Sequence, residues 1–263
     1  MIKAEIHEFY LPYPNMKDRR VRVYVPEHKE GERLPVIYMT DGQNLFDGDS
    51  CVWGCWHTIE AVEAEMQSGL GGAVIVAIDH GNEHRDNELT PGSIGKVICA
   101  DEMENFTEPL GEEFDSFLVN KVMPYVEANF PIIKDRTHTA ICGSSSGGLQ
   151  SFFTGLEHSD KFSMIGAFSP AFLLYTEEDM RAWIVSKLRE TLPYLYLYTG
   201  SGDELEQRIY QSTEMVYDIL MEIGYPYESM NEVVMFDYRH HEDAWAEIFK
   251  DFLHTFLART SGI

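Results

Sequence analysis

The segment Gly143-Ser144-Ser145-Ser146-Gly147 has the Gly-x-Ser-x-Gly pattern of a sharp strand-to-helix turn that presents a serine. Residues 137–142 (THTAIC) before it predict a short buried strand, and residues 146–153 (SGGLQSFF) after it predict the start of a helix. Glycines are wanted two residues to either side of the central serine because a Cβ atom there would clash with neighbouring backbone. This context predicts that Ser145 is a nucleophile rather than part of an ordinary Gly/Ser loop.

Strand-like and helix-like segments alternate along the chain, which is typical of a mostly parallel sheet covered by helices. A leading antiparallel pair is expected at 2–11 and 19–26, the second with one face in water because its valines alternate with polar residues. Further strands are expected at 34–39, 73–78, 139–142, 164–168, 194–198 and 233–236, and helices at 56–66, 114–126 and 244–257. With a serine turn in mid-chain, this order predicts the α/β-hydrolase fold, an α/β architecture with helices on both faces of the sheet, as one domain over residues 1–263.

A serine nucleophile needs a base, and in this fold the base is a histidine near the end of the chain. His240 and His241 follow the last predicted strand, where that base is expected. We favour His240, because the earlier residue is freer to turn back over the sheet edge. His241 is then a surface residue at the start of the last helix.

The base needs a carboxylate to orient it, and this acid precedes the histidine in the chain. The strand at 194–198 runs into a glycine-rich turn that ends in Asp203, which is our predicted acid. Glu204 and Asp237 remain alternatives. Capping of the helix that begins at this point is the structural explanation for an acidic residue there.

An oxyanion hole needs backbone N–H groups aimed at the oxygen that becomes negative. One is expected from Ser146, the residue after the nucleophile. The other is expected from Gln43, in the loop 40–46 that follows the third strand, with Gly42 allowing close approach of the backbone. The alternative is that Asp41 and Gly42 form an ordinary turn.

Composition limits the partners of this chain. Its 44 acidic and 20 basic residues give a formal net charge of −24, which repels nucleic acids and anionic membranes, so neither is expected as a partner. The absence of a signal-peptide pattern predicts a cytoplasmic location, in which Cys51 and Cys55 are expected to be free thiols. Neither metal-binding nor nucleotide-binding motifs occur, so no metal and no cofactor are expected.

With these residues in place, the chain resembles the putative-esterase family of α/β-hydrolases, which includes feruloyl and acetylxylan esterases, enterochelin-type esterases, S-formylglutathione hydrolases and mycolyl transferases. The resemblance spans nearly the whole chain. Its most specific marks are the motifs at 41–47 (DGQNLFD), 85–91 (RDNELTP), 143–148 (GSSSGG) and 240–245 (HHEDAW). The last of these independently supports His240 over His241. Family members often carry a bulkier apolar residue where this chain has Ser146, a change expected to matter little because that residue contributes its backbone N–H.

The resemblance implies hydrolysis of a carboxylic ester without a cofactor, with Ser145, Asp203 and His240 as the triad. The expected substrate is a small acyl or carbohydrate-linked ester. A thioesterase or peptidase, or a non-catalytic binding protein on the same fold, is the alternative. The sequence does not determine the oligomeric state.

Three further segments are candidates for contact with substrate. Trp53 and Trp56, in the loop 46–56, and the segment 168–175 could wall a substrate pocket, although aromatic residues in loops are at least as often core. Arg85 could recognise an anionic or hydroxylated substrate, but a structural pair with Glu88 is favoured.

Overall fold

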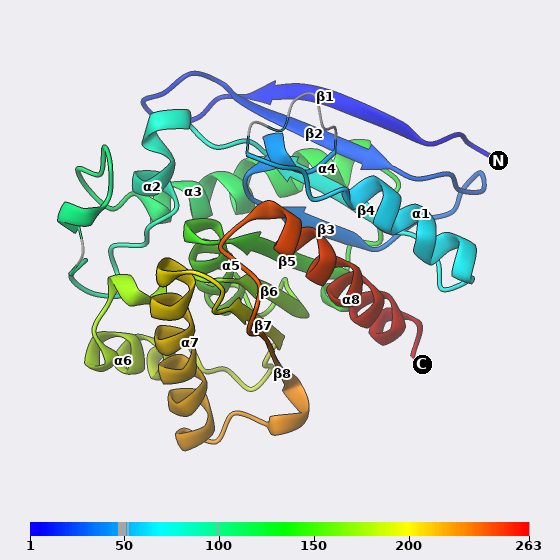
Figure 1. Cartoon of the computed structure of the whole chain (residues 1–263). Helices are drawn as coiled ribbons and strands as arrows, with labels where there is room; N and C mark the ends of the chain where they lie inside the picture. The colour runs from blue at the N-terminus through cyan, green and yellow to red at the C-terminus, as the bar shows by residue number, and fades with distance from the viewer. Residues whose placement is uncertain (47–50, 52, 99, 263) are drawn as a thin grey trace.

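The computed structural model describes residues 1–46, 51, 53–98 and 100–262. Asp47, which closes the first family motif, therefore lies outside the described residues. In the described part of the chain eight strands form one sheet, in the order β1-β2-β4-β3-β5-β6-β7-β8 (Figure 1). The strands are β1 (Glu5–Leu11), β2 (Arg19–Val25), β3 (Val36–Met39), β4 (Val74–Ile78), β5 (Thr139–Ser144), β6 (Met164–Phe168), β7 (Tyr194–Gly200) and β8 (Met230–Met235).

The direction of the strands confirms the predicted architecture. β1 pairs with β2 and β2 with β4 in antiparallel register, and every pairing from β4 to β8 is parallel. The α-helices are α1 (Thr58–Ser68), α2 (Arg85–Glu88), α3 (Gly111–Phe117), α4 (Met123–Asn129), α5 (Ser146–Glu157), α6 (Glu177–Lys187), α7 (Glu204–Glu222) and α8 (Glu242–Ser261). The π-helical segment η4 (Leu118–Val122) joins α3 to α4, so the helix predicted over 114–126 is one continuous but irregular helix.

Short 3₁₀ segments occupy several of the connections. They are η1 (Gly42–Asn44), η2 (Asn82–His84), η3 (Ala100–Glu102), η5 (Arg136–His138), η6 (Phe172–Leu174) and η7 (Tyr227–Ser229). None of the helices in the ranges described is long and apolar enough to cross a membrane.

The two faces of the sheet are buried under different helices. Successive side chains of a strand point to opposite faces, so Ile37 and Met39 of β3 join one apolar cluster while Val36 and Tyr38 join the other. α1 and α8 lie side by side over the first face, as Figure 1 shows, and residues of α3 to α7 belong to the cluster on the second. Burial on both faces explains why the central strands read as continuous apolar runs.

The prediction of a wet face on β2 is wrong. Of its polar residues only Arg20 reaches solvent appreciably, whereas Arg22 is 7% exposed. The Arg22 guanidinium donates to the Gly42 carbonyl at 2.7 Å and lies 5.3 Å from the centre of the Phe46 ring. The segment after β3 therefore covers this face, and the arginine satisfies a loop carbonyl instead of meeting water.

Parallel strands all end at one edge of a sheet, and in open α/β sheets ligands bind at that edge. The loops after β3, β4, β5, β7 and β8 are therefore the ones that this topology brings together. The fold thus gathers the predicted oxyanion loop, the serine turn, the predicted acid and the two candidate histidines at the carboxyl end of the sheet.

Candidate active site

Ser145 occupies a strained turn between β5 and α5. Its backbone has φ 58° and ψ −125°, a conformation that is uncommon for a residue with a side chain. The turn is held because the Ser145 N–H donates to the Phe168 carbonyl at 2.9 Å. Any Cβ atom added at Gly143 or at Gly147 would collide with the Thr40 side chain, so the glycine positions follow directly from this close packing.

His240 lies against this serine. Its Nε2 atom is 3.0 Å from the Ser145 Oγ atom, and its side chain is 14% exposed. The Trp245 ring meets the imidazole edge-on, with centroids 4.9 Å apart and planes at 89°. His241 instead caps α8, where its Nδ1 accepts from the Asp243 N–H at 3.2 Å. The structure therefore brings together the serine and the histidine that the sequence favours.

The carboxylate at the other side of the imidazole belongs to Glu206, which corrects the expected contact with Asp203. Glu206 Oε2 is 2.6 Å from His240 Nδ1, and the Glu206 side chain is fully buried. Asp203 instead accepts the His240 backbone N–H on Oδ2 and the Glu206 N–H on Oδ1, both at 2.8 Å. The two alternative acids, Glu204 and Asp237, are exposed side chains.

Asp203 is thus the N-cap of α7, and its chemistry fits that position. Partial burial opposes its ionisation, but the N–H groups of Glu206 and His240 outweigh that effect and lower the pKa of the carboxyl. The explanation of an acidic residue as a helix cap therefore holds for Asp203.

Three donors hold the Glu206 carboxylate. Besides His240 on Oε2, the Gly200 N–H donates to Oε1 at 2.7 Å and the Ser169 hydroxyl donates to Oε1 at 2.5 Å. Ser169 is itself fully buried, has φ 41°, and accepts from the Trp245 indole N–H at 2.9 Å. Three donors on its two oxygens fix the orientation of this buried carboxylate, which is what an imidazole that takes a proton from serine requires.

Sequence reasoning missed Glu206 and Ser169. The signal for Glu206 was the spacing Asp203-x-x-Glu206, a capping-box pattern that places the aspartate at the N-cap and the glutamate on the first turn. In this structure the glutamate turns inward to Gly200 and His240. No pattern in the sequence identifies Ser169, which reaches Glu206 across 37 residues of chain.

The expected oxyanion loop also lies at the site. Gln43, which belongs to η1, lines the same cavity as Ser145. Ser146 is the first residue of α5, and the backbone N–H groups in the first turn of a helix have no partner within the helix. Gly42 has to be glycine because a Cβ atom there would lie 2.6 Å from the Ala77 backbone of β4. Convergence of the Gln43 and Ser146 N–H groups on one oxygen stays a prediction.

Arg85 does not pair with Glu88. Its Nε and Nη2 atoms donate to the two carboxylate oxygens of Asp41 at 2.6 and 2.9 Å, and its Nη1 atom lies 3.2 Å from Asp86 Oδ1. Burial opposes ionisation of Asp41, but this guanidinium outweighs it and lowers the pKa of the carboxyl. Glu88 is fully buried and pairs with Arg19 through contacts of 2.6 and 2.7 Å.

Ser146 contributes more than its backbone. Its hydroxyl donates to the same Asp86 oxygen at 2.9 Å, where a bulkier apolar residue would make no hydrogen bond. Asp41, Arg85 and Asp86 therefore link the loop after β3, the segment after β4 and the start of α5 into one network. This network fixes the two segments that carry the expected oxyanion donors.

The site opens into a cavity of about 660 Å³ that is lined largely by polar side chains. Trp53 lines it with 71% of its surface exposed. Trp56 instead belongs to the core, where it is 3% exposed and stacks on Phe168 with ring centres 5.4 Å apart. The segment 168–175 is likewise mostly buried, so of these candidates Trp53 is the one placed to meet a ligand.

No disulfide joins Cys51, which is partly buried, to Cys55, which is buried. In the described ranges no group of three or more His, Cys, Asp or Glu side chains is arranged to hold a metal ion.

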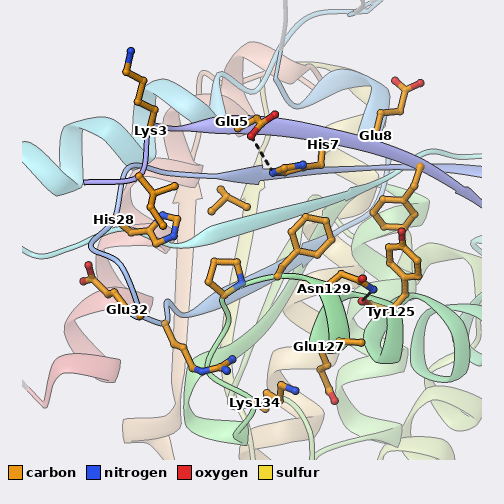
Figure 2. Close-up of a pocket in the computed structure, with 18 residues that line it drawn as sticks. Lys3, Glu5, His7, Glu8, His28, Glu32, Tyr125, Glu127, Asn129 and Lys134 are labelled. Atoms are coloured by element: carbon orange, nitrogen blue, oxygen red, sulfur yellow. Dashed lines mark hydrogen bonds and ion pairs between the residues drawn. The ribbon is translucent and has the colours of Figure 1, made fainter.

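A second cavity, of about 740 Å³, lies between β1 and the end of α4 (Figure 2). Its labelled side chains carry both signs of charge, and the His7–Glu5 ion pair drawn there spans 3.7 Å. The serine, the imidazole and the Glu206 carboxylate are all absent from its lining. Ser145 and His240 instead line the cavity of about 660 Å³.

Comparisons with known proteins show which fold and family this chain resembles. The chain is 24% identical over 218 residues to the uncharacterized protein YbbA of Bacillus subtilis strain 168, which covers 79% of this chain and 80% of that protein. It is 24% identical over 210 residues to an endo-1,4-beta-xylanase/feruloyl esterase of Xylanibacter ruminicola, covering 77% of this chain but only 23% of that protein. Among solved structures, the siderophore hydrolase EstA of Aspergillus nidulans superposes with a TM-score of 0.73 at 20% identity, over 95% of each chain.

The structural likeness, at this level of identity, establishes the fold. The family follows from a family model described as "Putative esterase", which matches residues 15–190, a span that includes the serine turn and the loop after β3. A match over more than half of the chain, on the α/β-hydrolase fold, places this protein in the Putative esterase family, as a carboxylic-ester hydrolase.

Proposed function

We propose that this protein is a serine esterase in which Ser145 is the nucleophile, His240 the base and Glu206 the carboxylate that orients the base. The observation that carries the proposal is the imidazole position, with Nε2 3.0 Å from the serine oxygen and Nδ1 2.6 Å from the glutamate. A histidine bridged in this way holds the tautomer that can accept the serine proton.

The reaction proceeds in two acyl transfers. His240 Nε2 takes the proton of Ser145 as the serine oxygen attacks the ester carbonyl, and the carbonyl oxygen becomes negative. The N–H groups of Gln43 and Ser146 stabilise that oxygen, while Glu206 stabilises the imidazolium. The imidazolium then gives its proton to the departing alcohol, and the acyl group stays on the serine.

Water completes the cycle. His240 takes a proton from water, which attacks the acyl-serine, and the collapse of the second tetrahedral intermediate releases the acid and restores the serine hydroxyl. No step needs a metal or a cofactor. The substrate is a small-molecule or carbohydrate-linked ester, in keeping with a polar cavity of about 660 Å³ and with relatives described as a feruloyl esterase and an iron(III) salmochelin esterase.

The direct test compares the hydrolysis of a short p-nitrophenyl ester by wild type and by Ser145→Ala. We expect turnover to fall by about 10⁴- to 10⁶-fold in the variant. Ser68→Ala, at an exposed serine near the end of α1, is the matched control and should keep full activity. A fluorophosphonate should label Ser145 in wild type, as located by peptide mass spectrometry.

Equal rates in wild type and Ser145→Ala would remove Ser145 as the nucleophile. Matched ester, thioester and amide substrates then define the reaction class. A faster thioester or amide reaction, relative to the uncatalysed rate of each, would replace the esterase assignment.

A further inference from the structure

Glu242 places a buried carboxylate beside the catalytic cavity. It is 8% exposed, it lines the cavity that contains Ser145 and His240, and its Oε1 atom accepts from the Asn44 side-chain N–H at 3.2 Å. Asn44 is the one side chain in the described part of the chain that donates a hydrogen bond to this carboxylate. A carboxylate can accept about four hydrogen bonds, so Glu242 retains unused acceptor capacity.

Asn44 shows the same shortage of donors. It is 6% exposed and lines the same cavity, and its side-chain carbonyl oxygen is buried without a hydrogen-bond partner among the described residues. A buried acceptor that meets no donor is costly, so the Asn44 oxygen and the unfilled positions of the Glu242 carboxylate both favour a ligand that brings donors. Burial also raises the pKa of Glu242, because it outweighs the opposing effects of the residue's own backbone N–H and of the nearby Arg85 guanidinium.

The charge of the cavity decides which kind of donor suits it. Its lining includes the carboxylates of Asp41, Asp86 and Glu242, and those of two exposed residues, Glu83 and Glu104. Arg85 is the one arginine or lysine among the lining residues described, and Asp41 and Asp86 already engage its guanidinium. A cavity with this imbalance attracts cations and repels anions.

Trp53 adds an aromatic surface to the same cavity. Its indole is largely exposed at the cavity lining, where a ring face is available to a ligand. Tryptophan is the aromatic side chain that binds cations best through its face. An acidic wall beside an exposed indole is the combination that recognises an ammonium group.

We propose that the catalytic cavity selects esters that carry an ammonium group, with Glu242 as the residue that receives the cation. The proposal rests on the serine esterase function proposed above and names its substrate class. The ammonium supplies N–H donors to Glu242 and to the Asn44 oxygen, which has no partner among the described residues, and Trp53 offers its ring to the cation. Anionic esters are disfavoured for the same electrostatic reason.

The test uses pairs of substrates that match in shape and differ in charge. 2-(Dimethylamino)ethyl butyrate, protonated at neutral pH, and 3-methylbutyl butyrate place an N–H-bearing cation, or its neutral counterpart, on the alcohol. Ethyl 6-aminohexanoate, ethyl heptanoate and monoethyl adipate compare a cation, a neutral group and an anion on the acyl chain. We expect kcat/KM to favour the cationic member of at least one set by about tenfold at low salt. This preference should shrink as salt screens the charges.

Glu242→Gln separates the charge from the structural contact, because the glutamine oxygen can still accept from Asn44. The cation-to-neutral ratio of kcat/KM should fall toward one in this variant. Glu32→Gln removes the same charge from the cavity of Figure 2, and it should leave the ratio unchanged.

Two results would overturn the inference: equal rates on both members of every set, or a preference for the anion. A cation preference that survives in Glu242→Gln would remove Glu242 from the role. Each of these outcomes requires ester hydrolysis that depends on Ser145. If no ester is hydrolysed in a Ser145-dependent way, the proposed function fails first, so the two failures are distinguishable.

Discussion

Replacing Glu206 with glutamine tests the assignment of the acid most sharply, because three donors converge on the two oxygens of this side chain. Gly200 N–H and the Ser169 hydroxyl share Oε1, and His240 Nδ1 lies against Oε2. A glutamine offers one oxygen and one NH₂ group. If the oxygen keeps Gly200 and Ser169, the NH₂ group faces the imidazole and favours the tautomer with hydrogen on Nε2. That tautomer cannot accept the serine proton.

The expected loss in kcat for Glu206→Gln is therefore about 10⁴-fold, the size seen when a triad carboxylate becomes an amide in serine proteases. Asp203→Asn is the matched control, since it makes the same chemical change three residues away. Asparagine can accept only one of the two backbone N–H groups that Asp203 holds. It should cost about 1–2 kcal/mol of stability and lower kcat about tenfold through a looser His240 backbone.

The assay is steady-state hydrolysis of a p-nitrophenyl ester by wild type and both variants, with circular dichroism and urea unfolding to confirm that each is folded. KM should change little in either variant, because neither side chain lines the cavity that receives the substrate. The reasoning is refuted if folded Asp203→Asn loses as much activity as Glu206→Gln. It is equally refuted if Glu206→Gln stays within tenfold of wild type.

Three further perturbations follow from buried groups. Ser169→Ala and Ser169→Gly both remove the hydroxyl that donates to the triad carboxylate, and each should lower kcat by about ten- to a hundredfold with little change in KM. Full activity in Ser169→Gly, which relieves the positive φ, would show that the hydroxyl is dispensable. Arg19→Met leaves the fully buried Glu88 without its cation, so the free energy of unfolding in urea should fall by about 3–5 kcal/mol. A loss below about 1 kcal/mol would contradict a buried pair. Burial and the neighbouring Glu214 raise the pKa of Glu232 from 4.5 to about 8. Between pH 4.5 and about pH 8 the folded state therefore keeps a proton that the unfolded state releases. The free energy of unfolding falls as the pH rises across this range. Glu232→Gln should therefore raise the melting temperature at about pH 9 but not at about pH 4, and an equal gain at both would exclude the titration.

The sheet could be predicted because its signals are local. β3 and β4 are short apolar runs without polar interruption, which is typical of strands buried on both faces. α8 carries its apolar stripe from Ala244 to Leu257, over about four turns. The error on β2 had a different origin. Whether Arg22 meets water depends on what the loop after β3 does, and no pattern within residues 19–25 contains that information.

The same distinction explains the site. The serine turn and His240 follow from backbone chemistry and chain order, both visible in the sequence. The choice between Asp203 and Glu206 depends on which of two side chains on one helical turn points inward. The capping-box spacing correctly predicts that the Asp203 carboxylate caps the start of the helix. It also predicts that the Glu206 side chain bonds back to the Asp203 backbone N–H, which it does not do here. In the structure Glu206 turns inward instead, because Gly200 and Ser169 donate to Oε1 and the loop after β8 brings His240 to Oε2.

The first turn of α7 fixes the base in two ways at once. Asp203 holds the backbone of His240, Glu206 holds its imidazole, and the Asp203 carboxylate also binds the Glu206 N–H. The base and its carboxylate therefore move together with one helix end, whose positive dipole favours the negative charges of Asp203 and Glu206. The serine is tied to the same unit through β6, because Phe168 holds its N–H and the neighbouring Ser169 holds Glu206. A distance of 3.0 Å between Nε2 and Oγ is thus set by two short chains of hydrogen bonds that meet at one buried carboxylate. This is why loss of Glu206 should affect the reaction far more than loss of Asp203, although both carboxylates contact the same histidine.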